Sequence, residues 1–347
     1  MIKWKESHDE DSRALLQKEF KAFLGEDKNK PLDRFVQLVR DNPELELCFR
    51  GNSDSSPRIS IYENNHIIFT VLTSGMVKIS FNHARYYKNW KSLYDSLIDY
   101  GFSGKIEDED GFIDIGEMTR STQKKGALTY DQIKDIYKNI LKPMFGSYFK
   151  AAEKKSAIDY FKKEEKVTVS GKKEKVEQQN LYRRFVNTHD GYYFYDLEFA
   201  QRHENMSSLL GDKNNNKPDM WGLHFGAEMK PDRIVVVEVK CTEAAMKGGS
   251  GIVTHLQKMK NYDKLPERRK EACQLMNHYA MLELRGLNNS IEFDYDDFKK
   301  LPVEIMLIFT DDAARIWEED ASFAADRKKT KEIPAPVGVN AKMYVVC

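Results

Sequence analysis

Two acidic residues and a lysine stand where short apolar segments begin and end. Asp219 opens the segment Met220–Phe225, and Glu238 and Lys240 close the segment Ile234–Val239. Carboxylate oxygens are the ligands that Mg2+ and Mn2+ prefer, and these cations often take a substrate phosphate as a further ligand. A lysine beside them can stabilise negative charge that develops on the phosphate. These residue types predict a divalent-metal site that acts on a phosphate ester.

Both apolar segments have the composition of β-strands. The residues between them, Gly226–Asp232, have the composition of a turn, so the two strands are expected to form a hairpin. A hairpin centred on Met229 pairs Asp219 with Val239. Asp219 then lies at the end of the sheet where the second strand finishes.

The side chains of the second strand alternate between the two faces of the sheet. Glu238 and Lys240 are two residues apart and share a face, whereas Val239 points to the other face. We therefore expect Asp219, Glu238 and Lys240 to meet at a solvent-reached strand end. The carbonyl oxygen of Val239 is a further candidate metal ligand. Asp232 is expected in the turn, roughly 20 Å from Glu238 at about 3.3 Å per residue, and outside the site.

The sequence Pro218-Asp219 followed by Glu238-Val239-Lys240 resembles the signature of the PD-(D/E)XK, or restriction-endonuclease-like, nucleases. The resemblance implies Mg2+- or Mn2+-dependent hydrolysis of phosphodiester bonds, with DNA favoured over RNA as the substrate. It also implies an α/β core with a mixed central sheet flanked by helices. The signature is short, and an acid followed at the second position by lysine also ends strands that merely emerge into solvent.

The order of the elements supports the resemblance over residues 174–310. The family core consists of a helix, three strands, a helix and a further strand. The chain offers, in order, a helix carrying Val176, Leu181 and Phe185, a strand at 192–200, the hairpin, a helix at 252–262 and, after another helix, a strand at 303–310.

One more acid is expected on the first helix of this core. Glu177 lies four residues before Leu181, which places it on the apolar face of the helix. Burying an unpaired carboxylate is costly, and a metal ion would explain its position. Glu177 is therefore a candidate metal ligand and catalytic residue. Glu174 competes for this role, and an ion pair between Glu177 and Arg184 is the structural alternative.

A glycine-rich segment after the motif, Lys247–Gly251, precedes the helix that contains His255. Free main-chain amides at a helix start can bind phosphate, so Lys247 and Ser250 are candidate nucleic-acid contacts. Gln257 and Lys258, on the helix itself, are candidates as well. The alternative is a flexible turn in which Ser250 caps the helix.

Basic and aromatic residues alternate at residues 85–91, and Arg85 and Lys88 are candidate nucleic-acid contacts on that ground. Trp90, Tyr94 and Leu97 follow at helical spacing, however. This spacing favours a helix whose aromatic side chains pack against a core.

Length and charge set limits on the rest. The chain has 347 residues, which fits two domains, and 55 basic residues balance 55 acidic ones. Contacts with nucleic acid must therefore come from local clusters of charge. The four scattered cysteines predict neither a disulfide framework nor a zinc site. Without a long apolar run or a signal-like start, the chain is expected to be cytoplasmic, with no membrane partner.

The two expected domains are residues 1–160, an α+β module of unknown role, and residues 161–347, the nuclease-like domain. The leading hypothesis is a metal-dependent DNA endonuclease, and restriction or antiphage defence is a hypothesis for its role. One alternative is a nucleic-acid-binding protein with an inactive nuclease-like core. Another is a nuclease gated by a ligand or protein partner at the first module. A homodimer is compatible with each of these hypotheses.

Overall fold

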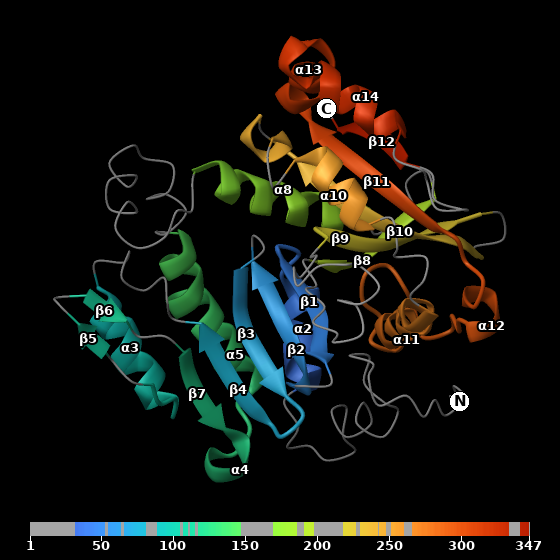
Figure 1. Cartoon of the computed structure of the whole chain (residues 1–347). Helices are drawn as coiled ribbons and strands as arrows, with labels where there is room; N and C mark the ends of the chain where they lie inside the picture. The colour runs from blue at the N-terminus through green and yellow to red at the C-terminus, as the bar shows by residue number, and fades with distance from the viewer. Residues whose placement is uncertain are drawn as a thin grey trace. The chain divides into compact units, whose positions relative to one another are not determined.

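A computed structural model of the chain divides into two compact units, residues 1–172 and 173–347 (Figure 1). The expected boundary after residue 160 falls twelve residues before this division. The structure describes residues 32–52, 55–63, 66–80, 89–104, 107–109, 112–114, 117–146, 169–185, 191–197, 218–226, 230–241, 243–247, 251–259, 266–332 and 341–346. Each unit is described by itself.

The first unit contains a five-stranded antiparallel sheet in the order β1-β2-β3-β4-β7. Apolar residues of the strands are buried, including Ile59, Ile61, Phe69 and Ile79. A separate two-stranded hairpin pairs β5 with β6. The strands are β1 (Leu45–Asn52), β2 (Ser55–Glu63), β3 (His66–Leu72), β4 (Met76–Ser80), β5 (Glu107–Glu109), β6 (Phe112–Asp114) and β7 (Glu117–Ser121).

In the first unit, the helices α2, α3 and η2 each bury apolar residues. In α3, Leu93 and Leu97 are buried whereas Trp90 and Tyr94 are half-buried, so the core-facing interpretation is confirmed for Leu97 and only in part for the aromatic residues. Thr129 and Gln132 form a reciprocal capping box at the start of α5. The labelled helices are α2 (Leu32–Asp41), α3 (Trp90–Asp99), α4 (Thr122–Lys125), α5 (Tyr130–Asp135) and the π-helix η2 (Ile136–Leu141).

The second unit contains a mixed five-stranded sheet in the order β12-β11-β10-β9-β8. The pairs β8–β9 and β9–β10 are antiparallel, whereas β10–β11 and β11–β12 are parallel. The expected α+β class and the mixed central sheet are confirmed. The strands are β8 (Tyr192–Leu197), β9 (Met220–Phe225), β10 (Pro231–Lys240), β11 (Val303–Thr310) and β12 (Ala341–Val346).

Along the chain, helices precede, separate and follow the strands of this sheet (Figure 1). They are α8 (Val169–Arg184), α10 (Ile252–Met259), α11 (Pro266–Met281), α12 (Tyr295–Phe298), α13 (Asp311–Glu319), α14 (Ala324–Glu332) and the short 3-10 turns η4 (Ala244–Met246) and η7 (Ala321–Phe323). Within the ranges given above, none of the helices combines the length and the apolar character needed to cross a bilayer.

The register of the β9–β10 hairpin differs from the expected one. The last pair of the ladder is Val237 with Met220, and the amide of Asp219 donates to the carbonyl of the same Val237, so Asp219 lies beside Val237 and not opposite Val239. Two features set this register: Pro231 pairs with Phe225, which centres the hairpin one residue before Met229, and one extra residue before Arg233 then shifts the ladder by one position.

The extra residue in β10 is Asp232. Pro231 pairs with Phe225 and Arg233 with His224, so Asp232 is the unpaired member of a β-bulge. The expectation that Asp232 is a turn residue is therefore wrong. The turn itself is shorter than expected, because the main-chain amide of Gly226 already donates to the carbonyl of Lys230.

Candidate active site

Two acidic residues, Asp219 and Glu238, lie at the end of the β9–β10 hairpin. The amide of Asp219 donates to the carbonyl of Val237 at 3.1 Å, which extends the ladder by one bond beyond β9. In return, the amide of Val239 donates to Oδ2 of Asp219 at 2.6 Å. The Asp219 carboxylate is therefore held at the main-chain amide of Val239, the residue that follows Glu238 in β10.

Glu238 is tied to two basic side chains through a single oxygen. Nζ of Lys240 lies 2.9 Å from Oε1 of Glu238, and Nδ1 of His255 contacts the same oxygen. His255 comes from α10, so a helix and a strand both contribute to the site. Strand alternation in the sequence predicted correctly that Glu238 and Lys240 lie together, but no sequence pattern assigned a role to His255.

The second oxygen of Glu238 is in a different situation. Oε2 is buried and has no hydrogen-bond partner in the part of the chain that the structure describes. An unpartnered carboxylate oxygen removed from water costs free energy unless a ligand or ion satisfies it. Oε2 is thus the atom of this site with the clearest need for a further partner.

The electrostatic environment keeps Glu238 ionised. Burial alone would raise its pKa, but the hydrogen bond from His255 and the charge of Lys240 lower it below the ordinary value. The carboxylate is therefore negative at neutral pH and available to a cation.

The site is buried, which corrects the expectation of a solvent-reached strand end. The exposed fractions are 9% for Asp219 and 2% for both Glu238 and Lys240. The physical reason is that β10 is the central strand of the sheet, with β9 and β11 on either side, and that His255 covers Glu238.

The donor set fits a hard divalent cation in part. Asp219 and Glu238 supply carboxylates from adjacent strands, and Oε2 of Glu238 lacks a partner among the described residues. Within those same residues, no three His, Cys, Asp or Glu side chains gather into a metal-binding group. Water and substrate oxygens would have to complete the coordination shell, as is common for Mg2+. The carbonyl of Val239 stays a predicted ligand.

Glu177 lies on the expected helix, four residues before the buried Leu181, and stays a predicted ligand. It is half-buried on α8, and the buried polar residues of that helix are Gln178 and Gln179. Gln178 is three and four residues before the buried Leu181 and Tyr182, so it shares their face, and Glu177 lies at the edge of that face, four residues before Leu181. Glu177 also forms no metal-binding group with Asp219 and Glu238 among the described side chains.

The candidate nucleic-acid contacts are only partly described. Lys247 is exposed, forms an ion pair with Glu243 and lies over the ring of Phe323 at 5.0 Å. The other candidates cannot be placed. Arg85, Lys88 and Ser250, together with the side chains of Glu174, Gln257 and Lys258, lie outside the described residues.

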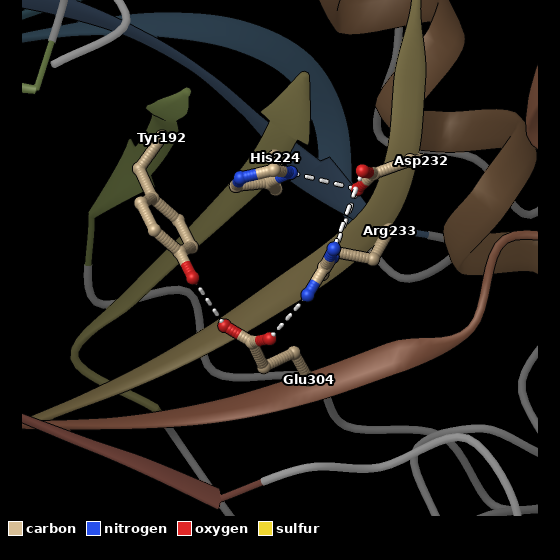
Figure 2. Close-up of polar contacts among 5 residues, drawn as sticks. All are labelled: Tyr192, His224, Asp232, Arg233 and Glu304. Atoms are coloured by element: carbon tan, nitrogen blue, oxygen red, sulfur yellow. Dashed lines mark hydrogen bonds and ion pairs between the residues drawn. The ribbon is translucent and has the colours of Figure 1, made fainter. Parts of the chain in front are cut away.

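A second polar cluster crosses four strands at the end of β10 far from Glu238 (Figure 2). Arg233 donates to both oxygens of Asp232 and, through Nη1, to Oε2 of the buried Glu304 at 2.9 Å. Tyr192 donates to Oε1 of Glu304 at 2.8 Å, and Nδ1 of His224 lies 2.8 Å from Oδ1 of Asp232.

The bulge explains how this cluster forms. Consecutive residues of a regular strand point to opposite faces, but a bulge brings two neighbouring side chains to the same side. Asp232 and Arg233 can therefore bind each other directly. The sequence signal was the dipeptide itself, an acid followed by a base at the start of an apolar strand, and it was interpreted as a turn.

No family model, no curated protein and no solved structure matches the chain.

Proposed function

We propose that the chain is a metal-dependent nuclease whose site is built by Asp219, Glu238 and Lys240. The observation that carries the proposal is the state of Glu238: an ionised, buried carboxylate with one oxygen fixed by two basic side chains and the other without a partner in the described part of the chain. Such an arrangement suits a carboxylate that offers one oxygen to a cation.

Each residue has a distinct task in this proposal. Asp219 and Glu238 would hold the cation, which would polarise a phosphoryl oxygen and activate water when bound. Lys240 keeps Glu238 charged and oriented. Its ammonium would also lie close to negative charge that grows on the phosphate during cleavage.

A second candidate is an inert, nuclease-like core that only binds nucleic acid. It is favoured by one observation, namely that Glu238 already makes a buried ion pair with Lys240 at 2.9 Å. Buried ion pairs also occur as purely structural features, and they need no ligand.

An assay with the full chain tests both candidates. Purified protein would be incubated with supercoiled plasmid, single-stranded DNA and RNA, each in Mg2+, Mn2+, Ca2+ or chelator. Cleavage that requires Mg2+ or Mn2+ and is lost in Glu238→Gln supports the nuclease, and the cleaved substrate identifies the nucleic acid. Tight binding without cleavage in any metal would favour the inert core.

A further inference from the structure

His255 occupies a fixed place at the start of α10. It is the fourth residue of this helix, and its main-chain amide donates to the carbonyl of Gly251 at 3.1 Å. Its side chain is 20% exposed, whereas the Glu238 side chain that it contacts is only 3% exposed. His255 therefore lies between the buried carboxylate and solvent.

The two basic side chains around Glu238 share their acceptor atom. Lys240 and His255 both contact Oε1, and neither is recorded at Oε2. Two basic side chains from different elements, Lys240 on β10 and His255 on α10, restrict the rotation of the carboxylate more than one contact would. The plane of the carboxylate is fixed, and with it the direction in which Oε2 points.

We propose that His255 is a positioning residue that orients Glu238 so that Oε2 is presented to the divalent cation. This inference rests on the proposed function. Lys240 could not do this alone, because a flexible ammonium accepts many geometries, whereas the contact with His255 adds a second fixed point from another element, α10. Hydrogen bonds to metal-ligating groups commonly set both affinity and geometry.

The role predicts that an N–H at the place of Nδ1 is what matters. His255→Asn retains such a donor, because the side-chain amide nitrogen of Asn lies close to where Nδ1 lies in His. His255→Leu has a similar size and no donor. Val253→Ala, two residues earlier on α10 and outside the site, controls for a general disturbance of the helix.

The test measures Mn2+ binding by titration calorimetry on the full-length variants, together with the cleavage rate at saturating Mn2+. We expect His255→Leu to weaken Mn2+ binding by about 10- to 100-fold, the range seen for such outer contacts. His255→Asn should recover most of this loss, and Val253→Ala should bind as the wild type does. The cleavage rate of His255→Leu at saturating Mn2+ should fall less than the affinity.

Other outcomes overturn the inference in separate ways. Wild-type affinity in His255→Leu would show that His255 does not orient Glu238. An equal loss in His255→Asn would mean that the imidazole itself binds the cation or the substrate. A wild-type chain that binds no Mn2+ and cleaves nothing would instead refute the proposed function.

Discussion

The main-chain amide of Val239 donates a hydrogen bond of 2.6 Å to Oδ2 of Asp219. This bond joins the start of one strand to the end of its neighbour, at the point where the candidate ligands lie. Asp219 is therefore a structural acceptor as well as a candidate metal ligand. The two roles can be separated, because an amide side chain keeps the acceptor but loses the charge.

Asp219→Asn and Asp219→Ala should differ in stability but agree in function. The Ala variant leaves the Val239 amide without its acceptor, which should lower the free energy of unfolding by about 1–3 kcal/mol. The Asn variant should lose less. Both should lose Mn2+ binding and metal-dependent cleavage. Chemical denaturation and calorimetry check this, and an Asn variant that still binds Mn2+ normally would remove Asp219 from the site.

Lys240→Met should separate catalysis from metal binding. Loss of one preorganised positive charge should reduce the cleavage rate by at least about a hundredfold. Metal affinity should stay the same or rise, because a positive charge near the cation is removed. The stability should fall by about 3–5 kcal/mol, since Glu238 loses a buried partner.

Lys299→Met is the matched control for that substitution. Lys299 is half-exposed and pairs with Asp296 on the surface, so its loss should change neither rate nor stability appreciably. If Lys240→Met lost metal affinity as severely as Asp219→Asn, the lysine would act only by holding the acids in place.

Neighbouring tyrosines of β8 give a matched pair of stability predictions. Tyr192 donates to the carboxylate of Glu304, whereas Tyr193 donates to the main-chain carbonyl of Arg285 at 3.2 Å. Both are buried. Tyr192→Phe should cost about 1.5–3 kcal/mol and Tyr193→Phe about 0.5–1.5 kcal/mol, because hydrogen bonds to charged groups are stronger. Equal losses in denaturant unfolding would contradict the charge-assisted character of the first bond.

Acid should weaken the cluster around Asp232. Burial alone would raise the pKa of Asp232, but hydrogen bonds from Arg233 and His224 hold it below the ordinary value of 3.8. A depressed pKa gives stability that is complete above the ordinary value and is lost as the pH falls through the lower one. The unfolding free energy of the wild type should therefore drop more steeply below about pH 4 than that of Asp232→Asn. Superimposable pH profiles would count against the pairing.

Cys273 should resist alkylation in the folded chain. Burial, together with the charges of Asp294 and Asp297, raises the pKa of its thiol to about 12. Only the thiolate reacts, and at pH 8 roughly one molecule in ten thousand would carry it. Iodoacetamide at pH 8 should label the Cys273 peptide in guanidinium but not in buffer, as read by mass spectrometry. Rapid labelling of native protein would show that the thiol is accessible.

Local pattern was enough to predict much of the second unit. β9 and β11 match the expected strands residue for residue, because each is an apolar run bounded by polar residues. The convergence of Glu238 and Lys240 followed from the alternation of a strand alone.

The missed features depend on contacts that no local pattern contains. The register of Asp219 was wrong because the hairpin is centred one residue earlier than expected and because the ladder then shifts at Asp232, which contacts His224 on the other strand. The contact of His255 with Glu238 depends on how α10 is oriented against the sheet, which spacing along the helix does not fix. β12 was not predicted because a parallel strand pairs with a partner distant in the sequence.

Beyond the bulge at Asp232, the number of residues in β10 decides which face of the sheet carries Glu238 and Lys240. From Arg233 onward each added or removed residue would turn Glu238 and Lys240 to the opposite face of the sheet, while a change of two would return them. Single insertions between Arg233 and Glu238 should therefore abolish the site, and double insertions should leave both side chains on the correct face. In natural variants, insertions and deletions within the strand would involve two residues at a time. A change of a single residue would be accepted only in the turn before Lys230.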